Sequence, residues 1–455
     1  MNEQKKFEFV ADIRVEHAMD VDQRIFIPGR DKLSKGESLS PDSTAYDMLH
    51  TLSTTWPCLS FDIIPDSLGA NRKSYPATLY AVAGTQAESR KVSNNEILVI
   101  KLSCLSRMER LGESDSDDDD SSDEAAEPIL ETKSLPMTSI TNRIRAHQFP
   151  STNSAAPPTT LTATMTESAQ LLIHNITPHL RAFDSPGTVI TPQQSRPMAT
   201  LKVHQEQGSE GYALDWAPLS PTPTLLSGDN SGNIFLHSSV DAGAGKWTTD
   251  TRPYKGHEGS VEDIQWSPNE KNVFASASSD GTVRIWDIRS KSRRPAITVE
   301  VSDTDVNVLS WSKQTQHLLA TGADDGVWAV WDLRQWKPLS TTPTAGTMSS
   351  ANGSGTENAQ PEPVARFNFH KEQITSVEWH PTDDSIVCVA AGDNTMTLWD
   401  LAVEFDDEEA RGSASAGEGV PPQLLFVHYM EDVKEGHWHP QIPGCVMGTG
   451  GAGFG

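Results

Sequence analysis

The chain has 455 residues, of which 36 are Lys or Arg and 62 are Asp or Glu, so its formal net charge is 36 − 62 = −26. A surface this acidic repels phosphate backbones, which argues against direct nucleic-acid binding and favours basic protein partners. Four cysteines lie far apart with no CxxC pair, which excludes a zinc ribbon and a dense disulfide framework and suits a reducing compartment.

Residues 1–41 form an N-terminal extension. The first ten residues, MNEQKKFEFV, are too polar for a signal peptide, and no run of about 18 apolar residues occurs, so we expect a soluble protein without a membrane segment. Residues 42–55 are predicted to hold a short helix capped by Asp42 or Ser43, with Tyr46 and Leu49 on one face.

Residues 56–455 carry a repeat. Three segments align without gaps: FASASSDGTVRIWDIR (274–289), LATGADDGVWAVWDLR (319–334) and CVAAGDNTMTLWDL (388–401). In each, an aspartate in a tight turn precedes a tryptophan by six residues, and another tryptophan ends an alternating strand upstream (Trp266, Trp311 and Trp379). Alternation buries every second side chain, and Asp-Gly or Asn-Thr closes a hairpin. Periods near 40–50 residues with several short strands predict the blades of an all-β propeller.

Seven first strands can be placed, which predicts seven blades. They lie near residues 59–63, 142–147, 212–216, 261–266, 306–311, 374–379 and 433–439. The last blade is apparently truncated, because it reads PGCVMGTGGAGFG and stops at Gly455, with glycines where a strand prefers branched residues. We therefore expect the closing blade to lack a strand and to leave an exposed edge.

One blade carries four residues with the order and spacing of the hydrogen-bonded tetrad of WD repeats: His257, Ser276, Asp280 and Trp286. A Ser, a His and an Asp could also suggest a hydrolase triad. A catalytic site occurs once, whereas this set recurs from blade to blade in degenerate form, so the structural interpretation is favoured. No nucleophile elbow, phosphate loop or metal cluster accompanies it, and we expect neither an enzyme nor a cofactor.

Other blades depart from the tetrad. Ser302 stands where the histidine of the blade ending at Trp331 would lie, and Val389 replaces the serine of the blade that keeps His370. The blade near Trp216 carries Ser231 in place of the aspartate and His237 in place of the second tryptophan.

Motifs in every blade resemble one family. They include TTWPCLSFDII, TNRIRAHQF, LTATMTES, EGYALDWAPL, SVEDIQWS, TDVNVLSW and VPPQLLFVHYMEDVKEGHWHPQIPGC, between about Arg24 and Gly444. The chain resembles the glutamate-rich WD-repeat protein, a ribosome-biogenesis relative of the retinoblastoma-associated histone-binding WD proteins. The resemblance implies a monomeric nuclear and nucleolar escort of large-subunit ribosomal protein three. A histone chaperone and a substrate receptor of a cullin-type ubiquitin ligase remain alternatives.

An acidic insertion is predicted at 112–134, inside the first blade. Residues 113–127 hold nine acids, among them the run Asp117, Asp118, Asp119 and Asp120, and such a run cannot pack. It is either a solvated loop or a polyanion that shields a basic client. Ser114, Ser116 and Ser121 each precede an acid by three residues, which predicts phosphorylation by an acid-directed kinase.

Two further loops, at 338–362 and 402–420, have flexible compositions. In the histone-binding relatives a Pro-Pro loop and an N-terminal helix form a side groove for a client helix. The resemblance places Pro421 and Pro422 in that loop, with charge from Glu404, Asp406, Asp407, Glu408 and Glu409. The alternative is that the N-terminal helix only packs on the propeller.

Two WDxR strings end at Arg289 and Arg334 on consecutive blades. In some WD proteins such a pair docks onto a ubiquitin-ligase adaptor. Each arginine could instead pair with a neighbouring carboxylate at the blade edge.

Overall fold

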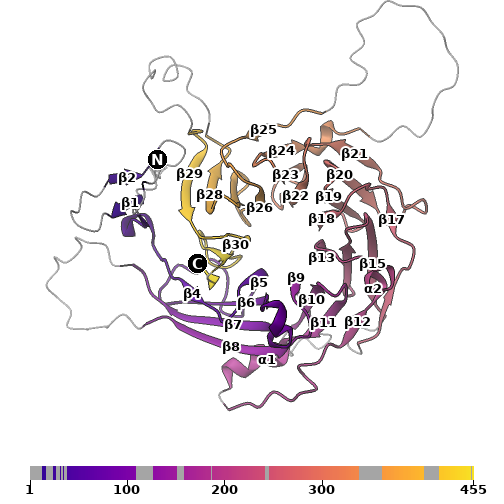
Figure 1. Ribbon diagram of the computed structural model, residues 1–455, viewed down its shortest axis with the longest axis horizontal. Coiled ribbons are helices and arrows are strands. Elements are labelled where there is room, and N and C mark those ends of the chain that lie inside the picture. The colour runs from indigo at the N-terminus through magenta and orange to yellow at the C-terminus, as the bar shows by residue number, and fades with distance from the viewer. Residues whose placement is uncertain are drawn as a thin grey trace, which may run out of the picture.

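The computed structural model describes residues 13–16, 24–26, 31, 34, 38–108, 127–150, 158–185, 187–240, 245–337, 361–403, 420–451 and 453–455. Seven antiparallel sheets are arranged in a ring around a central axis (Figure 1), so the prediction of a seven-bladed all-β propeller is confirmed. None of the described helices has the length and apolar character to cross a membrane.

Each blade contributes its strands in the same order from the central axis to the rim (Figure 1). The inner strands are β5 (Cys58–Ile64), β9 (Thr141–Phe149), β13 (Leu214–Trp216), β18 (Val261–Trp266), β22 (Val306–Trp311), β26 (Ile374–Trp379) and β30 (Glu435–Trp438). The second strands are β6 (Ala77–Thr85), β10 (Thr159–Thr166), β14 (Thr224–Gly228), β19 (Val273–Ser278), β23 (Leu318–Ala323), β27 (Ile386–Ala391) and β31 (Val446–Gly450).

The third strands are β7 (Glu96–Leu105), β11 (Leu171–Asn175), β15 (Asn233–Ser239), β20 (Thr282–Asp287), β24 (Trp328–Asp332), β28 (Thr395–Asp400) and β32 (Gly453–Phe454). The outer strands are β8 (Ile129–Pro136), β12 (Ala199–Leu201), β16 (Trp247–Thr249), β21 (Ile297–Glu300), β25 (Ala365–Phe367), β29 (Leu424–Tyr429) and β4 (Leu52–Ser53). An additional strand, β17 (Tyr254–Lys255), also pairs with β15. The helices are α1 (Thr177–Asp184) and α2 (Val203–Gln207), with 3₁₀ turns η2 (Ser89–Asn94) and η3 (Leu333–Gln335).

The core lies between neighbouring blades. Alternation along each strand buries one set of side chains against the next sheet, as where Ala275, Val283 and Ile285 of one blade meet Leu309, Leu319 and Trp331 of the next. Five of the seven inner strands have a register shift near their starts, seen for example at Val261/Asp263 and Val306/Val308. Such a bulge bends and twists the strand locally.

The closing blade combines strands from the N-terminal and C-terminal parts of the sequence. Its sheet runs β30–β31–β32–β4, so the outer strand comes from residues 52–53. Gly453 has a φ of +140°, and a Cβ at this position would collide with the carbonyl oxygen of Leu52, so only glycine permits this pairing. The predicted absence of a strand is therefore wrong: the third strand is present, although it is only two residues long.

The N-terminal segment is not helical as predicted. Residues 42–55 contain only the 3₁₀ turn η1 (Ser43–Ala45), which Asp42 caps by accepting a hydrogen bond from the Thr44 N–H at 2.8 Å, followed by extended chain and β4. Upstream, β1 (Ile13–Glu16), β2 (Arg24–Phe26) and β3 (Ser38–Ser40) form a separate three-stranded sheet. Instead, Tyr46 packs against Phe426, with ring centroids 5.2 Å apart, and a short isolated helix is only marginally stable in water.

The predicted acidic insertion also has a different C-terminal bound. Residues 129–136, assigned in part to the insertion, form β8 and pair with β7 from Glu96↔Pro136 to Ser103↔Ile129. Residues 112–126 of the insertion, with Asp117 to Asp120 and the three candidate phosphoserines, lie outside the described residues.

Candidate functional site

Within the fourth blade, the four side chains predicted as a tetrad lie in one hydrogen-bonded chain. His257 Nδ1 lies 3.0 Å from Asp280 Oδ2, and His257 Nε2 lies 2.6 Å from Ser276 Oγ. The Trp286 indole N–H donates to the same Ser276 oxygen at 2.8 Å. Ser276 and Trp286 are fully buried, so no substrate reaches this hydroxyl and the arrangement stabilises the blade instead of catalysing a reaction.

Two degenerate tetrads are completed by residues that the sequence did not single out. In the third blade the sequence predicts Ser231 at the aspartate's position, but His204 Nδ1 lies 3.1 Å from Asp229 Oδ2, so Asp229 supplies the carboxylate. In the sixth blade Val389 replaces the serine, and Thr397 supplies the hydroxyl, 3.0 Å from His370 Nε2 and 2.7 Å from Trp399 Nε1. A neighbouring position can therefore fill the same hydrogen-bonding role.

The inner strands show a second recurring set of contacts. Each inner strand is the edge of its sheet, so some of its N–H groups have no ladder partner. At most junctions, a polar side chain on one inner strand accepts an N–H from the next inner strand. The pairs are Asp62 with Ala146 (2.8 Å), Asp215 with Trp266 (2.7 Å), Asp263 with Leu309 (3.0 Å), Ser310 with Trp379 (3.2 Å), Glu378 with Trp438 (3.0 Å) and Glu435 with Phe61 (3.0 Å).

At the remaining junction the polarity is reversed, because Arg143 Nε donates to the Tyr212 carbonyl at 2.9 Å. Sequence reasoning missed this ring. A sequence signal for the ring was available, because five of the seven repeats have an acid within the first strand. In the four of these strands that end in tryptophan, the acid precedes the tryptophan by one or three residues. The five are Asp62, Asp215, Asp263, Glu378 and Glu435.

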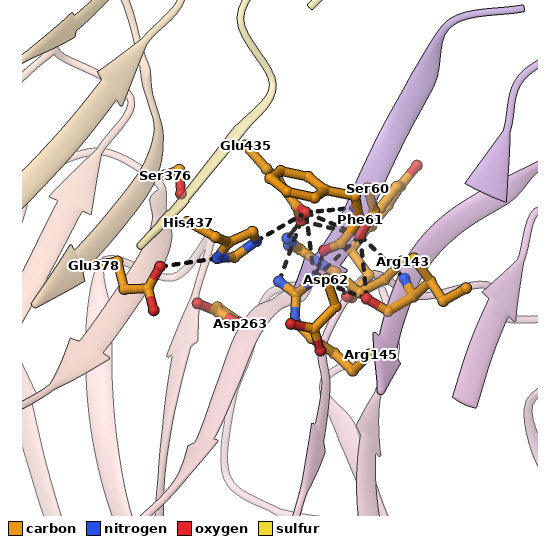
Figure 2. Close-up of polar contacts among 12 residues, drawn as sticks. Ser60, Phe61, Asp62, Arg143, Arg145, Asp263, Ser376, Glu378, Glu435 and His437 are labelled. Carbon is orange, nitrogen blue, oxygen red and sulfur yellow. Dashed lines mark hydrogen bonds and ion pairs between the residues drawn. The ribbon is translucent and has the colours of Figure 1, made fainter. Parts of the chain in front are cut away.

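Glu435 occupies the centre of the ring closure (Figure 2). It is 2% exposed, and its carboxylate pairs with Arg143 and, at 3.2 Å, with Arg145 of the second blade. The same carboxylate accepts from Ser60 Oγ at 3.1 Å in the first blade and lies 3.3 Å from His437 in its own blade. One side chain therefore links the seventh, first and second blades.

Burial and charge act against each other in this cluster. Burial alone would raise the pKa of Glu435, but the Arg145 and Arg143 guanidiniums hold it well below its usual value. Burial would lower the pKa of His437, but its contacts with Glu378 and Glu435 outweigh burial and raise it to about 9. His437 is therefore an imidazolium at neutral pH. In the third blade, burial raises the pKa of Asp215 to about 7.

A cavity of about 430 Å³ lies on the side of the ring, where the N-terminal segment, the end of β29 and the closing blade meet. Tyr46 and Leu49 both line it, beside Leu52, Tyr429, Met430 and Phe454. The Tyr46 hydroxyl is 2.9 Å from His428 Nδ1, and burial raises the pKa of Tyr46 to about 12. Glu431 is the acid among the lining residues.

The structure brings together only part of the predicted client-binding set. Tyr46 and Leu49 meet at the cavity, whereas Pro421 and Pro422 precede β29 and do not line it. Glu404 and the acids from Asp406 to Glu409 lie outside the described residues. Most of the 338–362 and 402–420 loops lies outside them too.

The two WDxR arginines are paired as well as exposed. Arg289 binds Asp287 at 2.6 Å and Arg334 binds Asp332 at 2.6 Å, while both arginine side chains remain 67% exposed. Each guanidinium donates to its own strand's aspartate, which fixes its direction without hiding it. No described group of three His, Cys, Asp or Glu side chains is arranged to hold a metal.

Comparison with known proteins agrees with this architecture. The profile of the WD domain, G-beta repeat, matches residues 248–287, 294–332 and 361–400, and that of the histone-binding protein RBBP4 matches 36–106. The ribosome assembly protein rrb1 of Schizosaccharomyces pombe is 44% identical over 432 residues, covering 94% of this chain and 83% of that protein. The chain belongs to the family of rrb1 and the glutamate-rich WD-repeat proteins.

Other similar proteins carry related names. The glutamate-rich WD repeat-containing protein 1 of Dictyostelium discoideum is 40% identical over 453 residues, covering 95% of this chain and 84% of its own. The protein HEAT STRESS TOLERANT DWD 1 of Arabidopsis thaliana is 38% identical over 462 residues, covering 95% of this chain and 90% of that protein. The resemblance drawn from the motifs is thereby confirmed. The RBBP4-type match covers Leu39 to Ser53, which contribute one part of the cavity lining, and the first three strands of the first blade, β5, β6 and β7.

Proposed function

We propose that this protein is an acidic escort that binds a basic ribosomal protein during assembly of the large ribosomal subunit. The observation that carries the proposal is the side cavity, an apolar recess of about 430 Å³ on a chain of net charge −26. Apolar side chains fix a client segment in the recess, and the net negative charge of the chain, with Glu431 in the lining, attracts its lysines and arginines. The name of the rrb1 relative, a ribosome assembly protein, supports this role.

The family resemblance favours large-subunit ribosomal protein three as the client, and the nucleus and nucleolus as the place of action. The acidic run 113–127 and the acids of 404–409 supply many negative charges for such a client. One exposed ion pair is worth about 1 kcal/mol or less, so this part of the affinity must come from many weak contacts and fall steeply with salt.

Replacing Leu49 by Glu tests the cavity. Leu49→Glu places a charge in the apolar recess and should weaken client binding about tenfold, equivalent to about 1.4 kcal/mol. Leu219→Glu is the matched control, because Leu219 is 43% exposed and lies outside the cavity lining. Affinity for purified ribosomal protein three is measured by calorimetry at physiological salt. Equal affinities of both variants and the wild type would remove the cavity from the proposal.

A histone-binding role is the second candidate. The match of residues 36–106 to the histone-binding profile favours it, since these residues include Tyr46 and Leu49 of the cavity. A competition assay decides between the two clients: core histones and ribosomal protein three are added at equal concentration to the same preparation of this protein. The client that displaces the other binds more tightly.

A third candidate is a ubiquitin-ligase substrate receptor. The exposed Arg289 and Arg334 on consecutive blades favour it, and a similar protein carries the name HEAT STRESS TOLERANT DWD 1. The double change Arg289→Ala and Arg334→Ala should abolish co-purification of a cullin adaptor while leaving client binding intact. Unchanged co-purification would exclude the role of this pair.

A further inference from the structure

The outer strands of the ring differ in length and cover. β12, β16, β21 and β25 have three or four residues each, and β4 has two. β29 has six residues, and side chains of the chain's own N-terminal segment cover it: Phe26 packs on Tyr429 at 5.9 Å and Tyr46 packs on Phe426. β8 is the longest, with eight residues on the outer rim (Figure 1).

The outer edge of β8 is open. In the part of the chain that the structure describes, β8 pairs with β7 alone, and no backbone hydrogen bond reaches its other side. Alternate residues of 129–135 therefore present unpaired N–H and C=O groups along this edge, which is a template for another strand, while Pro136 at its end has no N–H.

Side chains along β8 leave this edge accessible. Ile129 and Leu130 are 48% and 38% exposed at its start. A lysine often protects a free edge, but Lys133 lies over the Phe183 ring of α1 at 5.6 Å, on the face of the sheet. Glu131 is turned the same way and pairs with Lys101 of β7 at 3.3 Å. Both charges are thus engaged within or beside the blade.

The sequence directly before β8 defines the charge of a suitable partner. Residue 127 ends a fifteen-residue run with nine acids, and β8 begins two residues later. A strand added to β8 therefore lies within chain reach of the densest negative charge in the protein, which favours lysine and arginine and repels acidic segments.

We infer that the outer edge of β8 receives an extended, basic segment of a protein partner as a fifth strand of the first blade. This inference rests on the proposed function, because it assigns a second contact for the same basic client. Backbone pairing supplies the affinity along the edge. Ile129 and Leu130 point to opposite faces of β8, so each contacts an apolar side chain of the added strand on its own face.

The test uses the full chain with two probe peptides of equal charge and composition. One is a ten-residue alternating Lys-Val peptide, and the other has D-Val at every valine, which prevents a regular strand. Hydrogen exchange is measured for residues 129–136. The all-L peptide should slow exchange of alternate β8 amides about fivefold or more, as expected for one added hydrogen bond per amide, and the D-Val peptide should not.

A charge variant separates edge pairing from simple attraction. Leu130→Asp makes the region more acidic, so attraction alone would tighten binding of the all-L peptide, whereas loss of the apolar contact should weaken it several-fold. Val364→Asp is the matched control, since Val364 is 59% exposed beside the short outer strand β25, and it should leave the affinity unchanged.

The outcomes separate the inference from the proposed function. Equal binding of both peptides without protection of β8 overturns the edge assignment and leaves the acidic escort standing. Binding of neither peptide in dilute buffer overturns both. Protection of β8 that rises with protein concentration and needs no peptide would assign the edge to a second copy of this chain, against our inference.

Discussion

The fourth and the closing blades are held together in different ways. The fourth blade has strands of six, six, six and four residues, and its tetrad joins side chains of its own strands and the loop before them. The closing blade has strands of four, five, two and two residues, and its main polar contacts run from Glu435 and His437 to three other blades. A blade with a complete motif is stabilised from within, whereas a short blade depends on its neighbours.

The largest expected effect is at Glu435. Glu435→Ala leaves Arg143, Arg145 and His437 beside each other without the carboxylate that neutralises them, and it frees the Phe61 N–H. Breaking a buried ion pair from one side costs about 3–5 kcal/mol, so we expect a loss of this size in the free energy of unfolding. Urea denaturation measures it. The control is Glu206→Ala, on the exposed surface of α2, which should have little effect.

If Glu435→Ala and Glu206→Ala unfolded at the same urea concentration, the ring would not depend on this carboxylate. The closing blade would then be held by strand pairing between β32 and β4 in spite of its two-residue length.

The second largest effect is the pH dependence of stability, which differs between the closing blade and the fourth blade. The pKa of His437 is raised from 6.5 to about 9 in the folded protein, so its contribution is fully present below pH 6.5 and is lost as pH rises through 9. This rise in the pKa of His437 corresponds to a contribution of roughly 3 kcal/mol to the free energy of unfolding. In the fourth blade burial lowers the pKa of His257, which gives no such loss in alkali.

Thermal unfolding between pH 6.5 and 10 tests this for the wild type and for His437→Gln. The wild type should lose more stability than the variant over that interval. Parallel curves for the two proteins would show that His437 is neutral in the folded state and would contradict the assigned contacts.

The sequence predicted the fourth blade better than the closing blade for a physical reason. Spacing within one repeat reveals a tetrad such as His257 to Trp286, because its members lie within 30 residues of each other. The pairing of β4 with β32 joins residues about 400 apart, and Glu435 meets Arg145 across 290 residues. No local pattern encodes such contacts, so the sequence wrongly predicted a missing strand.

The N-terminal segment illustrates a second limit. A cap at Asp42 and apolar residues at helical spacing predicted a helix over 42–55, yet Tyr46 packs on Phe426 and the chain continues in extended form. Tertiary packing overrode a weak local preference. Even so, Tyr46 and Leu49 meet at the same cavity, because both line it from the extended segment.

A moderate effect is expected inside the fourth blade. Ser276→Ala removes the hydroxyl that His257 and Trp286 share, and it leaves both ring nitrogens buried without that partner. The cost of such unsatisfied groups is about 1–3 kcal/mol, below that expected for Glu435→Ala. The free energy of unfolding in urea is the measurement, with Ser292→Ala on the exposed turn after β20 as the control. A larger loss for Ser276→Ala than for Glu435→Ala would reverse the comparison between the blades.

The smallest effect is expected in the sixth blade, where the hydroxyl of the tetrad comes from Thr397 on β28 and not from position 389 on β27. Thr397→Val deletes the hydroxyl that contacts His370 and Trp399, and we expect it to cost about 1 kcal/mol, because valine keeps the shape and the apolar contacts. Adding Val389→Ser returns a hydroxyl to the usual position of the repeat. If the tetrad needs only a hydroxyl between the two rings, the double variant recovers part of the loss. If it loses more than the single variant, the hydroxyl position is fixed by packing in each blade, and degenerate blades cannot be restored by the consensus residue alone.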